Sequence, residues 1–252
     1  MEKFDRNYEM TKYKTEEEQL KAIDKDPFAF QFIKNPSEEI KLEAVKRDEW
    51  TIQFIKKPSE KIKLAVVNKN GYSIQHIKNP SEEIKLAAVK RDGGAIKYIK
   101  RPSEEVQLAA VERDGGAIKY IKRPSEEVQL AAVEKNGWPI QFIKKPTEKV
   151  KLEAAKQNGK CIMYIKNPSE EIQLEAVRQD GCLIQFIKNP SEEIQLEAVR
   201  QDGRAIKYIR KPTEKVIRTA ILNGATKDDL MCIRDINRNK ISDELWLQIQ
   251  LM

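Results

Sequence analysis

Few side chains in this sequence have the chemistry of catalysis or metal binding. The 252 residues include one histidine, His76, and three cysteines, Cys161, Cys182 and Cys232. The cysteines form no CxxC pair, their odd number argues against a disulfide framework, and His76 has no second histidine or cysteine at ligand spacing. The sequence also lacks a GxxxxGK[ST] or GxGxxG phosphate loop, an HExxH helix and a nucleophile elbow. We therefore expect no metal, no cofactor and no enzymatic activity.

Serine and glutamate are abundant, but they recur at fixed places in a repeat. The stretch from Pro36 to Lys57 reads PSEEIKLEAVKRDEWTIQFIKK, and its proline returns every 22 residues as far as Pro212. Because Ser37 and Glu38 return with the proline, they are expected to stabilise the start of a helix rather than to do chemistry. A fixed period of this length is typical of a solenoid.

Each repeat predicts two helices. Pro36 suits the first position of a helix, because its fixed φ fits there and its missing N–H would have no helical partner. An Asp-Gly or Asn-Gly pair such as Asn70-Gly71 is expected to end that helix, with the glycine in the left-handed conformation. A second helix of about two turns, for example over residues 51–56, should follow and depend on its neighbours for stability.

The repeat predicts an all-α fold, a right-handed α-solenoid of about nine to ten 22-residue helix-turn-helix repeats with N- and C-terminal capping helices. Residues 1–35 are expected to form a leader and a degenerate capping repeat that starts at Thr15. Residues 36–223 form the nine-unit array. Residues 224–252 form the C-terminal capping helices, with Thr226 and Ser242 as their N-caps.

Composition restricts the setting of the protein. There are 47 Lys and Arg against 40 Asp and Glu, a net charge of +7 and a pI of about 9.1, so an acidic partner is compatible with a mixed surface. The first ten residues are charged rather than apolar, and no run approaches the ~18 apolar residues of a membrane span. We expect a cytoplasmic protein that does not enter a membrane.

The unit P-S-E-E-[IV]-x-L-x-A-[VA]-x-x-[DN]-G-x-x-I-x-[FY]-I-K resembles a family of uncharacterised short bihelical repeats of bacterial and phage proteins. In form it is a shortened relative of HEAT-like and variant leucine-rich helical repeats. The resemblance covers roughly residues 15–223, with local departures at Pro27, Glu49 and His76. It implies an α-solenoid and brings no catalytic residues. The phage context of some relatives implies a phage or mobile-element accessory protein that acts on a host or defence protein.

One position in the repeat, directly after the glycine, varies more than the scaffold explains. It reads Phe28, Trp50, Tyr72, Gly94, Gly116, Trp138, Lys160, Cys182 and Arg204. Trp and Tyr dominate the energetics of protein interfaces. The candidate protein-binding residues are therefore Phe28, Trp50, Tyr72 and Trp138, with Met163 as a further apolar point. The alternative is that these rings attach the short helix to its neighbour.

Two other positions form regular columns. The aromatic column comprises Phe32, Phe54, His76, Tyr98, Tyr120, Phe142, Tyr164, Phe186 and Tyr208, and we expect its rings to pack between layers rather than to stack on bases. The basic column comprises Lys34, Lys56, Lys78, Lys100, Lys122, Lys144, Lys166, Lys188 and Arg210. Its cations either follow a phosphate backbone or lie at helix ends near the glutamates of the next helix.

The leading hypothesis is a non-catalytic scaffold that binds a macromolecule, foremost a protein, through its extended surface. The alternative is nucleic-acid binding centred on Lys97, Lys100, Arg101, Lys119, Lys122 and Arg123. Salt separates the two, because phosphate contacts weaken steeply as salt rises. Self-association through the end faces is a third mode that the sequence leaves open.

Overall fold

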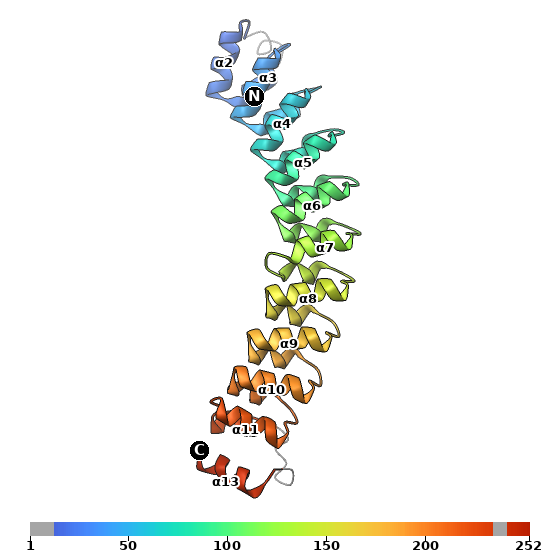
Figure 1. Ribbon diagram of the computed structural model, residues 1–252. Coiled ribbons are helices and arrows are strands. Elements are labelled where there is room, and N and C mark those ends of the chain that lie inside the picture. Colours follow the sequence, from blue (N-terminus) through green and yellow to red (C-terminus); the bar gives the residue numbers. More distant parts are fainter. Residues whose placement is uncertain (1–12, 234–240) are drawn as a thin grey trace, which may run out of the picture. The chain divides into compact units, whose positions relative to one another are not determined.

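The computed structural model describes residues 13–233 and 241–252, and these residues form helices and no β-strand. Each α-helix from α2 to α10 is followed by a short 3₁₀ helix (Figure 1), which confirms the all-α repeat solenoid. The α-helices are α2 (Glu16–Lys25), α3 (Glu38–Arg47), α4 (Glu60–Lys69), α5 (Glu82–Arg91), α6 (Glu104–Arg113), α7 (Glu126–Val133), α8 (Glu148–Gln157), α9 (Glu170–Gln179), α10 (Glu192–Gln201), α11 (Glu214–Leu222), α12 (Lys227–Met231) and α13 (Asp243–Leu251). The 3₁₀ helices are η1 (Pro27–Phe32), η2 (Glu49–Phe54), η3 (Gly71–His76), η4 (Gly93–Tyr98), η5 (Gly115–Tyr120), η6 (Trp138–Phe142), η7 (Gly159–Tyr164), η8 (Gly181–Phe186) and η9 (Gly203–Tyr208).

The chain divides into two compact units, unit 1 (residues 1–128) and unit 2 (residues 129–252), with the boundary inside α7. Each unit has its own apolar cluster, built from the isoleucines, valines and alanines that recur in every repeat. The repeat keeps isoleucine at the Ile52 position and leucine at the Leu42 position, which predicts that both belong to the core. Ile52 on a 3₁₀ helix is buried, as is Ile40 on an α-helix. Leu42 was expected in the core as well, but it is partly buried at the margin of the cluster.

The α-helices begin two residues later than the proline predicts. Ser37 is the N-cap of α3, with an extended backbone, and its Oγ accepts the Ile40 N–H at 3.3 Å. Pro36 therefore lies before the cap instead of at the first helical position. Glu38 and Glu39 occupy the first turn, where negative charge interacts favourably with the positive end of the helix dipole. The serine, rather than the proline, sets the start of each helix.

Most of the Asn-Gly and Asp-Gly pairs do not end helices in the way that the sequence predicts. Asn70 is extended, and its Oδ1 accepts the Tyr72 N–H at 3.0 Å, so it caps the start of η3. Gly71 is the first residue of η3 and is not left-handed. A Cβ on Gly71 would lie 2.2 Å from the carbonyl oxygen of Ala88 in the next repeat. Glycine is needed there because the backbones of successive repeats approach closely.

Gly137 is the exception in the array, with the predicted left-handed φ of 72°. In other repeats the third residue of the turn donates its N–H to the capping residue, as Thr51 does to the Asp48 carbonyl at 3.1 Å. Pro139 occupies this position after Gly137 and has no N–H to donate. The chain instead closes α7 with a bond of 2.8 Å from the Gly137 N–H to the Val133 carbonyl.

The second element of each repeat is a 3₁₀ helix and not the predicted two-turn helix over residues 51–56. In η2 the closing bond runs from the Ile55 N–H to the Ile52 carbonyl, three residues back, at 3.0 Å. Ile55 itself is extended, with φ −90° and ψ 109°. Short 3₁₀ segments are a common solution where too few residues are available for an α-helix. Lys56 and its equivalents consequently lie in a loop beyond the helix.

The residue before the repeat's proline is left-handed in five repeats. These residues are Asn35 (φ 52°), Asn79 (φ 50°), Arg101 (φ 53°), Asn167 (φ 50°) and Asn189 (φ 52°). Asparagine tolerates this conformation better than other side chains. The backbone therefore accounts for the asparagines at this position, which is Lys or Arg in other repeats, as at Lys57 and Arg123.

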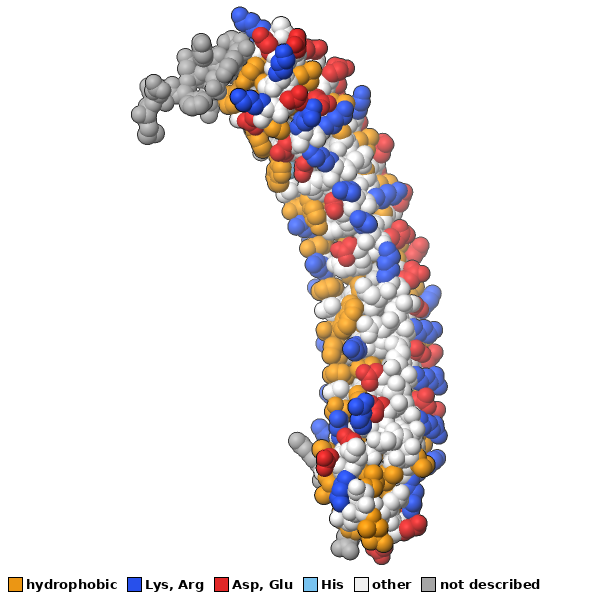
Figure 2. Space-filling model, turned by 90° about the vertical axis from the view of Figure 1, so that its left-hand side faces the viewer, with side chains coloured by type: hydrophobic (Ala, Val, Ile, Leu, Met, Phe, Trp, Pro, Cys, Tyr) orange, Lys and Arg blue, Asp and Glu red, His pale blue; other side chains and the backbone are white. Residues whose placement is uncertain are grey.

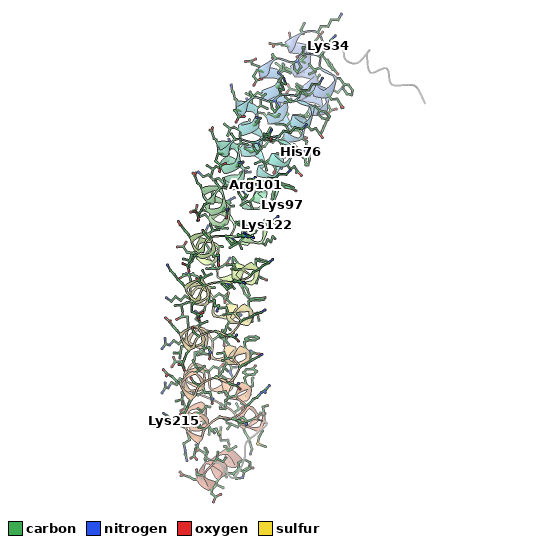
Figure 3. All side chains as sticks on the ribbon, turned by 90° about the vertical axis from the view of Figure 1, so that its right-hand side faces the viewer. Lys34, His76, Lys97, Arg101, Lys122 and Lys215 are labelled. Carbon is green, nitrogen blue, oxygen red and sulfur yellow. The ribbon has the colours of Figure 1, made fainter. Side chains whose placement is uncertain are left out.

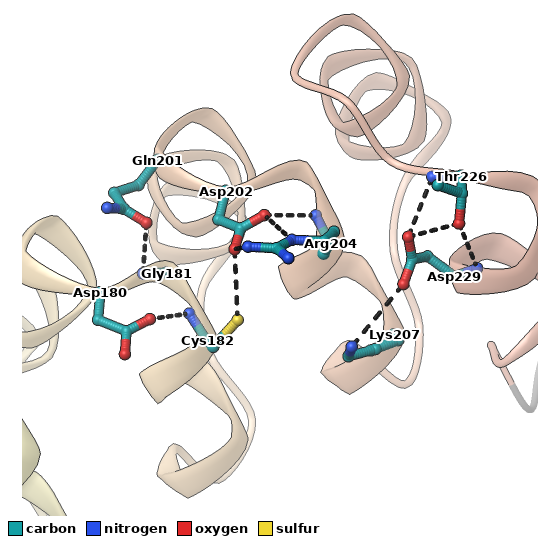
Figure 4. A network of polar contacts seen from close by, with 9 residues as sticks. All are labelled: Asp180, Gly181, Cys182, Gln201, Asp202, Arg204, Lys207, Thr226 and Asp229. Atoms are coloured by element: carbon teal, nitrogen blue, oxygen red, sulfur yellow. Dashed lines mark hydrogen bonds and ion pairs between the residues drawn. The ribbon is translucent and has the colours of Figure 1, made fainter.

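Polar side chains join successive repeats within each unit. Glu60 accepts a hydrogen bond from the N-cap hydroxyl of Ser81 at 2.8 Å, and Glu170 accepts one from Ser191 at 2.6 Å. Figure 4 shows such links near the end of unit 2, where Gly181 N–H donates to Gln201 at 2.8 Å. Each repeat thus fixes the start of the next one.

The ends of the array are closed as predicted. Thr15 caps α2 in a capping box with Glu18, which explains why Glu18 replaces the apolar residue of later repeats. Thr226 and Ser242 are the N-caps of α12 and α13. The amphipathic pattern of residues 226–252 predicts five apolar residues that cover the C-terminal face; Leu230, Ile233, Leu245 and Ile249 are buried, and Trp246 is partly buried.

The expected leader over residues 1–14 lies almost wholly outside the described residues. Among the helices that are described, none is long and apolar enough to cross a membrane.

Candidate binding surface

The first three 3₁₀ helices, η1 to η3, present the variable position of the repeat to solvent. The side-chain oxygen of the capping Asp or Asn accepts the backbone N–H of this residue, at 2.8 Å for Trp50, 2.9 Å for Phe28 and 3.0 Å for Tyr72. This bond fixes the backbone, so that the side chain projects from the surface. Within each unit, Figure 2 shows hydrophobic side chains, with Lys and Arg among them, along the margin that the 3₁₀ helices form, and charged side chains on the opposite margin.

Phe28, Trp50 and Tyr72, here called the aromatic edge, lie in three successive repeats of unit 1. Each ring meets the aromatic-column ring of the next repeat edge-on: Phe28 meets Phe54 with centroids 6.2 Å apart, Trp50 meets His76 at 4.9 Å, and Tyr72 meets Tyr98 at 6.4 Å. The three edge residues nevertheless remain 36%, 45% and 38% exposed. The rings of the aromatic edge therefore attach one repeat to the next, as one sequence-based alternative expects. They also leave exposed surface that a partner could contact, as the other alternative requires.

His76 packs against Trp50 in this arrangement, and its Nε2 is buried without a hydrogen-bond partner. Across the part of the chain that the structure describes, no three His, Cys, Asp or Glu side chains gather in a way that could hold a metal ion.

The other two candidate protein-binding residues lie in unit 2. Trp138 is partly buried and meets the Tyr164 ring at 5.9 Å. Met163, next to Tyr164 in the chain, is 45% exposed. The structure thus places the five predicted residues in two groups, three in unit 1 and two in unit 2.

The aromatic column is more exposed than expected. From Tyr98 onward its rings are not enclosed between layers, and their exposed fractions lie between 38% and 43%. The residues are Tyr98, Tyr120, Phe142, Tyr164, Phe186 and Tyr208. The reason is that a 3₁₀ helix of six residues buries one face on the α-helices and leaves its last residue at the margin.

The basic column is exposed in all nine repeats. None of its members takes part in an ion pair among the residues described. The glutamates that were expected to neutralise it bond elsewhere, as Glu60 does to Lys63 at 2.6 Å within α4 and to Ser81. No described carboxylate therefore lies within ion-pair distance of the column, and both sequence-based alternatives for its cations remain predictions.

The six candidate nucleic-acid residues all lie in unit 1, and their side chains are exposed. Figure 3 shows Lys97, Arg101 and Lys122 on the same face. The Lys97 ammonium lies 5.2 Å from the ring centre of Tyr72 and 4.7 Å from that of Tyr98, and Lys119 lies 4.9 Å from that of Tyr120. A side-chain hydrogen bond to Tyr98 raises the pKa of Lys97. Cations and aromatic rings therefore share this surface.

Comparison with known proteins adds a partial match. Residues 169–212, a span of two repeats, match a family model described as a domain of unknown function (DUF4116). Among curated proteins and among solved structures, no significant match was found.

Sequence reasoning missed a groove in unit 2, inside the matched span. It has a volume of about 780 Å³ and lies between the loops that follow η8 and η9. Its lining includes Phe186 and Tyr208 of the aromatic column with Lys188 and Arg210 of the basic column. Both columns were visible in the sequence, but nothing in the spacing shows that they meet in one groove.

Proposed function

We propose that this chain is a non-catalytic scaffold that binds a protein partner through the aromatic edge of unit 1. The exposure of Trp50, at 45%, is the observation that carries the proposal. A ring that is fixed at its base by Asp48 and His76 loses little conformational entropy on binding. Exposed and pre-positioned Trp and Tyr side chains are typical interface hot spots.

The proposal places the protein in the cytoplasm, which its three free thiols support. The repeat resemblance adds the kind of partner, namely a host or defence protein met by a phage or mobile-element accessory protein. In this proposal, Met163 and Trp138 of unit 2 provide a second apolar contact with the partner.

Affinity purification from the native host, with the wild type and two variants, tests the proposal. Trp50→Ala should remove the partner, since truncating a hot spot costs ~2 kcal/mol or more, about 30-fold in affinity. Leu222→Ala is the matched control, because Leu222 is an 86% exposed apolar residue away from the edge. A partner retained by both variants would refute the aromatic edge as the binding site.

Nucleic-acid binding is the second candidate, favoured by the exposed and unpaired basic column. The double variant Lys100→Glu with Lys122→Glu should then weaken binding of an oligonucleotide and reduce its salt dependence. Unchanged oligonucleotide binding by that variant would refute nucleic-acid binding through the basic column of unit 1.

A further inference from the structure

The groove in unit 2 lies between two consecutive loops and is built from three segments. The lining consists of residues 185–190, residues 208–211 and Gln195 of α10. Gln195 Nε2 donates to the Pro190 carbonyl at 3.0 Å, and Asn189 holds the turn with a left-handed φ of 52°. These contacts order the loop backbone, so the groove is formed before any ligand arrives.

The lining of the groove carries positive charge only. Lys188, Arg210 and Lys211 are exposed, and no Asp or Glu belongs to the lining. None of the three cations forms an ion pair with a described carboxylate. The nearby Glu192 accepts a hydrogen bond from the Thr213 hydroxyl at 2.6 Å instead. Three uncompensated cations beside one groove favour a ligand with several negative charges.

The groove also offers aromatic surface. Phe186 is 40% exposed and Tyr208 is 38% exposed, and both rings belong to the lining. Each ring precedes a cation of the basic column by two residues. The same order recurs in unit 1, where Tyr98 and Tyr120 are 40% and 41% exposed and are followed by Lys100 and Lys122. Ring and cation thus form a recurring pair.

We propose that this groove binds a single-stranded nucleic acid, with a base against Phe186 or Tyr208 and the phosphates on Lys188, Arg210 and Lys211. Aromatic platforms combined with a cationic path are how proteins bind single strands without regard to sequence. A duplex hides its base faces and gives the rings nothing to stack on. An acidic peptide satisfies the cations but leaves the two rings without a planar partner.

This site goes beyond the protein-binding proposal and does not depend on it, because it lies in other repeats. It rests on the second candidate function, nucleic-acid binding. It adds to that candidate a specific site, the groove in unit 2, where bases stack on rings while phosphates contact cations. The two are separable: Lys100→Glu with Lys122→Glu tests unit 1, and variants of the groove test unit 2.

Fluorescence anisotropy of a labelled 12-nucleotide single strand, titrated with the full chain, tests the proposal. Phe186→Leu with Tyr208→Leu keeps apolar bulk and removes stacking, and it should weaken binding about tenfold or more. Arg210→Glu with Lys211→Glu should weaken binding and reduce the slope of log K against log salt by about 1.4, for two lost phosphate contacts. The matched control is Lys156→Glu with Lys215→Glu, the same charge change at exposed residues of α8 and α11. Figure 3 shows Lys215 on the margin away from the 3₁₀ helices. Circular dichroism checks that every variant is folded.

Several results would overturn the proposal. One is that the wild type fails to bind the strand at 50 mM salt; another is that the control weakens binding as much as the groove variants do. Another is that a duplex of the same length binds as tightly as the strand and that Phe186→Leu with Tyr208→Leu weakens neither. This result would show that charge attraction alone accounts for binding. Displacement of the strand by polyglutamate at equal charge would favour an acidic peptide and likewise contradict it.

Discussion

Replacing Gly71 by alanine tests the account of how the repeats stack. The added Cβ would lie 2.2 Å from the Ala88 carbonyl oxygen, whereas carbon and oxygen in contact are about 3.2 Å apart. Both groups belong to the backbone, so the two repeats must separate by about 1 Å. Overpacking of this kind costs ~1–3 kcal/mol. The separation also stretches the 2.7 Å bond from the Gly71 N–H to Asp92, a charge-assisted bond worth ~1.5 kcal/mol or more.

We therefore expect Gly71→Ala to lower the free energy of unfolding by ~3 kcal/mol. With a slope of ~1–3 kcal/mol per molar urea, the unfolding midpoint should fall by about 1 M or more. Circular dichroism at 222 nm during a urea titration measures the shift.

Gly116→Ala is the matched control, in a 3₁₀ helix of the same unit. Its Cβ would meet only the Asp114 side chain, at 3.2 Å, and Gly116 has no positive φ. Alanine there should leave stability unchanged or raise it by ~0.5 kcal/mol, because the unfolded chain loses freedom. Equal unfolding midpoints for Gly71→Ala and the wild type would show that the close approach of the Ala88 carbonyl is not the reason why position 71 is glycine.

Three further predictions concern single positions. Arg101→Asn should raise the free energy of unfolding by ~1 kcal/mol, and Asn79→Arg should lower it similarly, because both residues are left-handed; urea midpoints of the pair check this, and a shift in the same direction for both would contradict it. Burial raises the pKa of the Cys161 thiol to about 11, so a thiol reagent at pH 8 should modify Cys161 far more slowly than the exposed Cys232. Since the unfolded thiol ionises first, Cys161 should make stability fall as the pH rises above about 9, and Cys161→Ala should remove that part of the fall. Hydrogen bonds from Lys63 and then Ser81 lower the pKa of Glu60, so its contribution is present above the ordinary value of 4.5 and is lost as the pH drops below it. Glu60→Gln should flatten the loss of stability between pH 5 and pH 3, measured by urea titration, and an unchanged pH profile would contradict this.

Features that depend on hydrogen bonds within one repeat were largely predictable. The caps at Thr226 and Ser242 were expected from their residue types and were found, and Thr15, expected as the start of a degenerate repeat, is also an N-cap. The helical content and the isoleucine core follow from the repeat in the same way. The main local error concerned Gly71, because a glycine beside asparagine has two explanations that the sequence cannot distinguish: a left-handed turn or a close approach.

The candidate binding surface was predictable residue by residue but not as an arrangement. The exposed Trp50 was chosen because its position varies, and the structure adds that it lies on His76 of the next repeat. The basic column was visible from its period, whereas the lack of ion pairs between it and the described carboxylates was not. That depended on Glu60 and its equivalents bonding to serines of the next repeat, a contact between residues 21 apart in the sequence.

The sequence by itself determined the period, the serine and threonine residues available as helix caps and the types of side chain in every column. These depend on short-range backbone geometry and on capping, which neighbouring residues set. Only the tertiary structure decided which columns share a face, because this depends on how far each repeat is rotated and shifted on the one before it. Side-chain packing across the repeat interface sets that rotation. It brings Phe186, Tyr208, Lys188 and Arg210 into one groove, and no pattern along the chain contains that information.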